Sequence, residues 1–132
     1  MITLTSIQWQ NGERSQTELV TRANFSKSGR TNIISYKDTE ATGFDGSVTT
    51  IRINNGKSAS IIRKGTANSA LFLEIGKKHF CQYGTPYGTL QLGIYTHEIR
   101  NTIASNGSIY MKYTLDLNAS HLSDNEIIIT IN

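Results

Sequence analysis

Large apolar and polar side chains alternate along much of this chain. The pattern is clearest at residues 90–95 and 109–117, where every second side chain is aliphatic or aromatic. Successive side chains of a β-strand point to opposite faces, so each of these segments predicts a strand with one buried and one hydrated face. The same pattern predicts strands at 2–10, 15–27, 31–37, 47–54, 58–64, 69–75, 77–83, 88–97, 108–117 and 125–131.

The residues between these segments are typical of tight turns. Asn, Asp and Gly tolerate the positive φ angles that two-residue hairpin turns require. Pro86 is the one proline of the chain and lies between Gly84 and Gly88, where a turn accommodates it better than a central strand does. The hairpin dipeptides are Asn11-Gly12, Asp45-Gly46, Asn55-Gly56 and Asn106-Gly107.

Composition supports an all-β fold in one domain. Ile, Thr and Val together make up 35 of the 132 residues, and β-branched side chains favour extended backbone. A chain of this length builds one core, so we predict a single domain over residues 1–132. Ten antiparallel strands exceed what one open sheet usually holds, and closure removes exposed edges. We therefore predict one closed antiparallel β-barrel of about ten strands. A two-sheet sandwich is the alternative, because periodicity does not show whether the first and last strands pair.

Several classes of protein are disfavoured by the sequence. No run approaches the roughly 18 consecutive apolar residues of a membrane-spanning helix, and the first residues lack the basic and apolar regions of a signal peptide. Cys81 is the one cysteine, which excludes an internal disulfide and a multi-cysteine zinc site. We predict a cytoplasmic protein.

Positive charge is concentrated in the middle of the chain. Residues 52–78 contain six Lys and Arg against one Glu, a net charge of +5, and the rest of the chain carries −2, which gives the overall +3. A basic surface of this kind attracts an anionic ligand or an acidic partner, although strand cations also serve simply to hydrate an exposed face. No recognition motif supports nucleic-acid binding, and we predict none.

No catalytic or metal-binding pattern stands out. His79 and Cys81 share one face of a predicted strand, but their Cβ atoms would lie roughly 7 Å apart, so we interpret both as packing residues. His97 and His121 do not have metal-ligand spacing with His79, and no close pair of carboxylates is present. The sequence therefore predicts a protein that is not an enzyme, with no catalytic residues, metal or cofactor.

The middle of the chain also resembles a known family. About forty residues closely resemble the YwiB-like family, small uncharacterised proteins of Gram-positive bacteria. The residues that carry the resemblance are Ile61-Ile62-Arg63-Lys64-Gly65, Asn68-Ser69, Leu71-Phe72, Gly76-Lys77-Lys78, Cys81-Gln82-Tyr83 and Thr85-Pro86-Tyr87-Gly88, followed by Leu90, Leu92 and Ile94.

The resemblance implies a calycin-like, lipocalin-like β-barrel in a cytoplasmic bacterial protein, and it implies no particular reaction. Its motif marks a set of residues whose role, in the fold or in function, stays open. They are Arg63, Lys64, Gly65, Asn68, Ser69, Cys81, Tyr83, Thr85, Pro86, Tyr87 and Gly88.

A binding barrel is the leading functional hypothesis. Arg63 falls in the apolar phase of its strand, so an interior ligand, small and hydrophobic or anionic, would have a polar anchor there. Asn68, Tyr83 and Tyr87 are the other candidate ligand contacts, although Asn68 is also suited to bracing a turn. The apolar lining would come from Ile61, Phe72, Leu90, Leu92, Ile94, Met111, Tyr113 and Leu115.

Two other hypotheses stay open. The second is a non-catalytic interaction or regulatory module that uses the basic 52–78 face, with Lys64, Lys77 and Lys78 as its contacts. The third is an enzyme that uses Cys81 or the scattered histidines. The apolar segment 127–131 further predicts that the last strand is covered on both sides, by the barrel or by a second copy in a homodimer.

Overall fold

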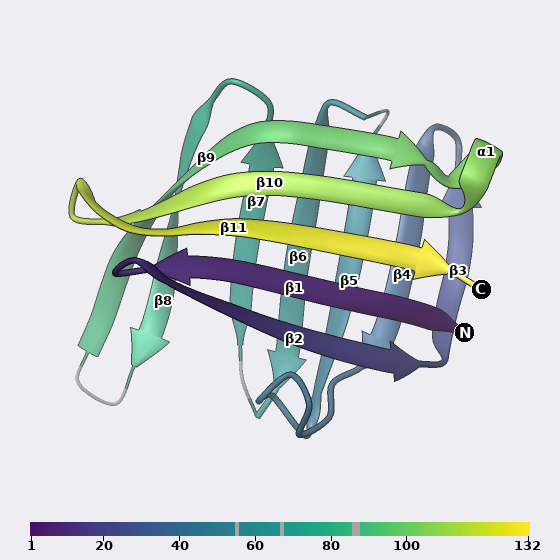
Figure 1. Ribbon diagram of the computed structural model, residues 1–132, viewed down its shortest axis with the longest axis horizontal. Coiled ribbons are helices and arrows are strands. Elements are labelled where there is room, and N and C mark those ends of the chain that lie inside the picture. The colour runs from purple at the N-terminus through teal and green to yellow at the C-terminus, as the bar shows by residue number, and fades with distance from the viewer. Residues whose placement is uncertain (55, 67, 86–87) are drawn as a thin grey trace.

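Eleven strands form two antiparallel sheets in the computed structural model, which describes residues 1–54, 56–66, 68–85 and 88–132 (Figure 1). The first sheet contains β1 (Ile2–Gln10), β2 (Glu13–Thr21), β8 (Lys78–Thr85), β9 (Gly88–Thr102), β10 (Ser108–Leu117) and β11 (Ser120–Ile131). The second contains β3 (Ala23–Ser28), β4 (Thr31–Lys37), β5 (Ser47–Asn54), β6 (Ser58–Gly65) and β7 (Ser69–Glu74). Their strand orders are β2-β1-β11-β10-β9-β8 and β3-β4-β5-β6-β7.

The sheets pack face to face with their strands running crosswise, and the five-stranded sheet lies behind the six-stranded sheet in Figure 1. Crossed packing of this kind is one of the two common arrangements of stacked sheets. Both inner faces contribute to one hydrophobic core. Its largest fully buried apolar side chains are Ile34, Ile51, Ile53 and Leu73 from one sheet and Ile94, Ile109, Met111 and Ile129 from the other.

Strand β5 shows how the sequence pattern produces this core. Ser47, Thr49, Ile51 and Ile53 are buried, and each residue between them faces away from the core. The strands at 2–10, 31–37, 47–54 and 108–117 have the bounds that alternation predicted. The alternation thus determined both the element and its buried face.

The prediction of one closed barrel is wrong. The first and last strands do pair, with Ile2 opposite Ile131, but they lie in the middle of the six-stranded sheet. The chain forms two open sheets, which is the alternative that periodicity left open. An isolated parallel bridge between Ile75 and Thr96 is a local contact between the sheets and does not close them into a barrel. The calycin-like classification is not confirmed.

A single-residue corner explains part of the difference. Alternation predicted one strand over 15–27, but the chain leaves the six-stranded sheet after β2 and enters the five-stranded sheet at β3. Arg22 is the residue between them, and each strand then pairs only with its own sheet. No Gly or Pro stands at this corner, so the sequence offered no turn residue to predict it.

Strand β11 is covered within one chain. It lies between β1 and β10, and Ile127 and Ile129 are buried against the five-stranded sheet. The chain itself therefore covers both edges and the inner face of this strand, whereas Ile128 on the outer face is only half-buried. Homodimer formation stays a prediction.

Helix contributes little to the described residues. The short α1 (Ile103–Asn106) joins β9 to β10 and ends at Gly107, whose positive φ of 67° suits a helix C-terminus. In the described part of the chain no helix has the length and apolar character needed to cross a membrane.

Gly65 has a structural reason to be glycine. It ends β6 opposite Ser47, with a φ of 135°. A Cβ at this position would overlap the carbonyl oxygen of Gly46 and lie 2.8 Å from the Cα of Ser47. Both obstacles are backbone atoms, so only a shift of β5 against β6 relieves them.

We expect Gly65→Ala to lower the free energy of unfolding by about 2–4 kcal/mol, since it adds a backbone clash to an unfavourable φ. Gly88→Ala is the matched control, because Gly88 has a similar φ of 123° but nothing lies within 4 Å of its Cβ position. That control isolates the cost of φ alone, about 1–3 kcal/mol. Urea unfolding measures both variants, and equal losses would contradict the close-approach explanation.

Candidate functional site

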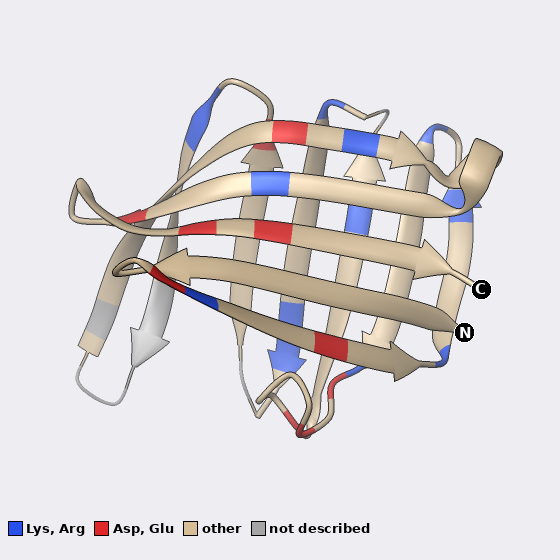
Figure 2. Cartoon of the chain, viewed as in Figure 1, with Lys and Arg blue, Asp and Glu red and all other residues tan. Residues whose placement is uncertain are grey.

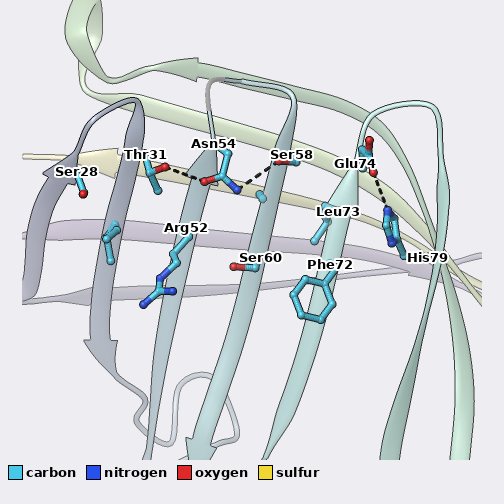
Figure 3. Close-up of a pocket in the computed structure, with 12 residues that line it drawn as sticks. Ser28, Thr31, Arg52, Asn54, Ser58, Ser60, Phe72, Leu73, Glu74 and His79 are labelled. Atoms are coloured by element: carbon cyan, nitrogen blue, oxygen red, sulfur yellow. Dashed lines mark hydrogen bonds and ion pairs between the residues drawn. The ribbon is translucent and has the colours of Figure 1, made fainter.

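A hollow of about 580 Å³ lies on the outer face of the five-stranded sheet (Figure 3). Its central row crosses four strands and contains Ile33, Arg52, Ser60 and Phe72, each paired in register with the next. The small Ser60 stands between the two large side chains of Arg52 and Phe72. We call this hollow the Arg52 pocket.

A second row of polar side chains borders the pocket. The Thr31 hydroxyl donates a hydrogen bond of 2.9 Å to Asn54 Oδ1, and Asn54 Nδ2 donates one of 3.3 Å to Ser58 Oγ. The three residues come from adjacent strands and lie in one line, as Figure 3 shows. These contacts hold the amide of Asn54 in one orientation.

The carboxylate of this pocket already has partners. Glu74 forms a 2.9 Å hydrogen bond with His79 Nε2 and a 3.0 Å ion pair with Lys77. The contact with His79, followed by that with Lys77, lowers the pKa of Glu74 below its ordinary value. Among the described residues no carboxylate lies within ion-pair distance of Arg52. Arg52 is thus an exposed cation without an acidic partner, next to apolar Ile33.

The two sheets carry opposite charge. The strands of the five-stranded sheet contain five Lys and Arg against one Glu, a net charge of +4, and those of the six-stranded sheet have four basic and six acidic residues, a net charge of −2. Figure 2 shows the acidic residues along β2, β9 and β11 and basic ones on β5 and β6. The Arg52 pocket therefore opens on the positive side of the molecule.

Arg63, the predicted anchor, lies inside the protein. Its Nε donates to Thr49 Oγ1 at 3.1 Å and to Asp38 Oδ2 at 3.3 Å, and its guanidinium carbon lies 3.8 Å from the centre of the Phe44 ring. The side chain of Asp38 is fully buried, and Thr42 and Thr49 donate hydrogen bonds to it. This arrangement neutralises both charges, as burial requires.

Two buried tyrosines complete this interior polar cluster. Burial, followed by the nearby Asp38 carboxylate, raises the pKa of Tyr36 to about 12. Burial likewise raises the pKa of Tyr113, from the opposite sheet, to about 12. Both phenols therefore stay neutral over the physiological pH range. Thr96 pairs in register with Tyr113, and its buried hydroxyl has no hydrogen-bond partner within the described part of the chain.

The other predicted ligand contacts do not join Arg63. Asn68 braces the turn after β6, since its amide accepts from Gly65 N at 3.3 Å and donates to Gly65 O at 3.1 Å. Pro86 and Tyr87 lie outside the described residues, and the side chains of Tyr83 and Thr85 are not described either.

The remaining motif residues are dispersed over four strands. Lys64 is exposed near the end of β6, and Ser69 pairs with Arg63 at the start of β7. Cys81 is half-buried against the core, and burial raises the pKa of its thiol, so it lacks the thiolate character of a reactive cysteine. Gly88 begins β9.

The predicted apolar lining is only partly inside. The prediction that Phe72 and Leu90 line the interior is wrong, because 48% and 38% of their surfaces are exposed. Phe72 pairs with Ser60 on the outer face, and Leu90 lies near the end of the β8–β9 hairpin. The other lining residues pack into or against the core.

The basic 52–78 segment does not form one face. Arg63 points inward, whereas Arg52 points outward from the same sheet. Lys77 pairs with Glu74, and Lys78 pairs with Asp116 of the six-stranded sheet at 2.6 Å. The prediction that this segment forms a single basic surface is therefore wrong. The five-stranded sheet as a whole is positive, and Arg52 is the unpaired arginine in its pocket.

Sequence reasoning missed a polar network on the opposite outer face. His97 Nε2 contacts Thr114 Oγ1 at 2.7 Å, Thr114 donates to Asp124 at 2.8 Å, and His121 contacts Asp124 at 3.2 Å. Register shifts in β9 and β11 beside β10 bring these residues together, and alternation alone does not predict such bulges. The described residues contain no group of three metal-ligating side chains.

The fold defines a small all-β protein of two crossed antiparallel sheets, with the Arg52 pocket on the outer face of the five-stranded sheet. Residues 2–129 match the model described as "Domain of unknown function (DUF1934)", and the chain belongs to this family. It is similar in fold to the ywiB protein of Bacillus subtilis, whose crystal structure aligns with a TM-score of 0.73 and 18% identity over 99% of this chain and 91% of that chain. No curated protein matches this chain. The resemblance to the YwiB-like family is confirmed.

We expect Arg63→Met to lower the free energy of unfolding by about 3–5 kcal/mol, because it leaves Asp38 charged and buried without its cation. Asp38→Asn combined with Arg63→Met should recover part of the loss, since no unpaired charge then remains. Urea unfolding of the single and double variants measures this coupling. A loss below about 1 kcal/mol for Arg63→Met would show that the ion pair does not stabilise the core.

Acid should weaken the fold partly through Asp124. The hydrogen bond from Thr114, helped by His121, lowers the pKa of Asp124 below its ordinary 3.8. A lowered folded-state pKa stabilises the fold above 3.8, and this contribution is lost as the pH falls through the folded value. Asp124→Asn should therefore show a slightly smaller loss of stability on acidification below pH 4 than the unchanged protein.

The control for Asp124→Asn is Asp45→Asn, an exposed aspartate whose side chain accepts no hydrogen bond from the described residues. Chemical denaturation at several pH values compares the three proteins. Identical acid dependence in the two variants would contradict a stabilising role for the Thr114 contact.

Proposed function

We propose that this protein is a non-catalytic, cytoplasmic binding protein that takes a small amphipathic molecule with an anionic group in the Arg52 pocket. The observation that carries the proposal is an arginine without an acidic partner in a hollow whose carboxylate, Glu74, is already paired. An anion that enters this hollow meets one uncompensated positive charge.

The guanidinium of Arg52 suits a carboxylate or phosphate. Arginine presents several N–H donors in a fixed plane and binds both groups through two parallel hydrogen bonds. The neighbouring strands supply the apolar flank of the site, with Ile33 on one side and Phe72 beyond Ser60 on the other. The pocket therefore offers one anion contact and an apolar flank, on the outer face of the sheet rather than in the interior where the sequence predicted the ligand.

The interior is less suited to this ligand. Core side chains such as Ile34, Ile94 and Met111 have no exposed surface, so they fill the space between the sheets. Arg63 is also held by Asp38 and Thr49, and a ligand anion would compete with a buried carboxylate for it. Both observations favour the outer pocket over the interior.

Phenyl phosphate tests the proposal, because it combines an anion with one flat ring. We expect Arg52→Gln to weaken its binding at least about 10-fold, since a hydrogen bond to a charged group contributes roughly 1.5–3 kcal/mol. Isothermal titration calorimetry or chemical-shift titration at low salt measures the dissociation constants.

Arg100→Gln is the control for this test. It makes the same change in charge on the six-stranded sheet, where Arg100 pairs with Glu98 at 3.0 Å. It should leave binding unchanged. Equal affinities of the unchanged protein and Arg52→Gln would remove the proposed function.

A further inference from the structure

We infer that the Arg52 pocket takes a mononucleotide, with the phosphate at Arg52 and the base against Phe72. This inference rests on the proposed function and names the class of ligand. It follows from the spacing of an unpaired cation, a small residue and an exposed aromatic ring along one row of the sheet.

The row has the length of such a ligand. Arg52, Ser60 and Phe72 occupy three adjacent strands, and neighbouring strands lie about 4.8 Å apart, so the two ends of the row are roughly 10 Å apart. Ser60 between them is small and only 9% exposed, so the accessible surface of the row lies at its two ends, and a sugar would span the distance between them. A simple inorganic anion would use only one end of this arrangement.

Phe72 suits the flat face of a base. About 48% of its surface is exposed, and it lies in the middle of β7, the edge strand of the five-stranded sheet. Bases stack on aromatic side chains with little dependence on sequence, and this contact supplies a large share of the affinity for unpaired nucleotides. An exposed phenylalanine beside an unpaired arginine offers one partner for each half of the ligand.

The polar row adds groups that suit a ribose. Asn54 uses one amide hydrogen on Ser58 and one lone pair of its oxygen on Thr31, so one donor and one acceptor position remain. Ser58 lies one strand away from Asn54 on the same face. Hydroxyl groups of a sugar can both donate to and accept from such a row.

The charges of the sheet favour a single nucleotide over a nucleic-acid strand. Lys64 and Lys37 lie on the same outer face, but they occupy the row of Val48, four residues along β5 from Arg52. Only Arg52 supplies a cation to the pocket without an acidic partner, among the residues that the structure describes. A strand of several phosphates would need cations at each step.

The test compares four probes: adenosine monophosphate, ribose 5-phosphate, adenosine and phenyl phosphate. Calorimetry at low salt should give adenosine monophosphate at least roughly 10-fold tighter binding than either ribose 5-phosphate or adenosine. Arg52→Gln should reduce its affinity to that of adenosine, and Phe72→Ala should reduce it to that of ribose 5-phosphate.

Phe80→Ala is the matched control for the ring, because Phe80 is 60% exposed on the six-stranded sheet and lies outside the pocket. It should leave all four affinities unchanged, as should Arg100→Gln. Phe72→Leu keeps the apolar character of the site but removes the flat ring. This variant should lose most of the affinity that the base adds. Such a loss would show that the base stacks on the ring rather than being held by apolar contact alone.

The outcomes distinguish this inference from the proposed function. One outcome is that phenyl phosphate binds in an Arg52-dependent way while adenosine monophosphate binds no more tightly than ribose 5-phosphate. That result would contradict the inference of a mononucleotide but leave the proposed anion site supported. If no probe depends on Arg52, both fail. A single-stranded oligonucleotide is titrated as a fifth probe. If it binds more than roughly 100-fold tighter than adenosine monophosphate, the occupant is a nucleic acid and the inference of a mononucleotide is again wrong.

Discussion

The inward-facing side chains of two crossed sheets must fill one shared space, and this requirement decides where polar chemistry can lie. Most of the inner faces meet as aliphatic side chains with little or no exposed surface. A charge placed among them needs a partner, because its burial in a low-dielectric interior is otherwise too costly. Arg63 meets this condition through Asp38, Thr49 and the ring of Phe44. Arg52, on the opposite face of the same sheet, has no such requirement, and it stays available to a molecule from solution.

Alternation predicted most strands because it reports a local property, the choice between core and water at each position. It predicted the phase of β6 as well, and so placed Arg63 on the inner face. It did not predict how the strands associate. The chain passes from one sheet to the other at Arg22 without a turn residue. The hydrophobic pattern continues across this corner, so it does not mark the boundary between the two strands. The choice between a closed barrel and two sheets depends on that corner and on which strand edges are left unpaired after it. Hydrophobic periodicity does not predict either feature.

The candidate site was less predictable, because it depends on register. Asp38 and Phe44 come from the connection between β4 and β5, and no spacing in the sequence links them to Arg63. In the same way, Arg52 and Phe72 are neighbours of Ser60 only once three strands are aligned. The network of His97, Thr114 and Asp124 needs bulges in addition to register. The sequence showed that residues 52–78 are basic. It did not show which of their cations point inward, which form ion pairs and which are unpaired.

The register that builds the core also builds the pocket. Arg52 lies between buried Ile51 and Ile53, and Ser60 lies between buried Ala59 and Ile61. A slip of one residue in the pairing of β5 with β6 would turn these aliphatic side chains out of the core, so the register is strongly held. The outward side chains inherit this constraint and keep their order across the strands. A ligand at Arg52, as proposed, would therefore meet groups carried on strands rather than on loops, and such preorganisation reduces the entropy that binding must overcome.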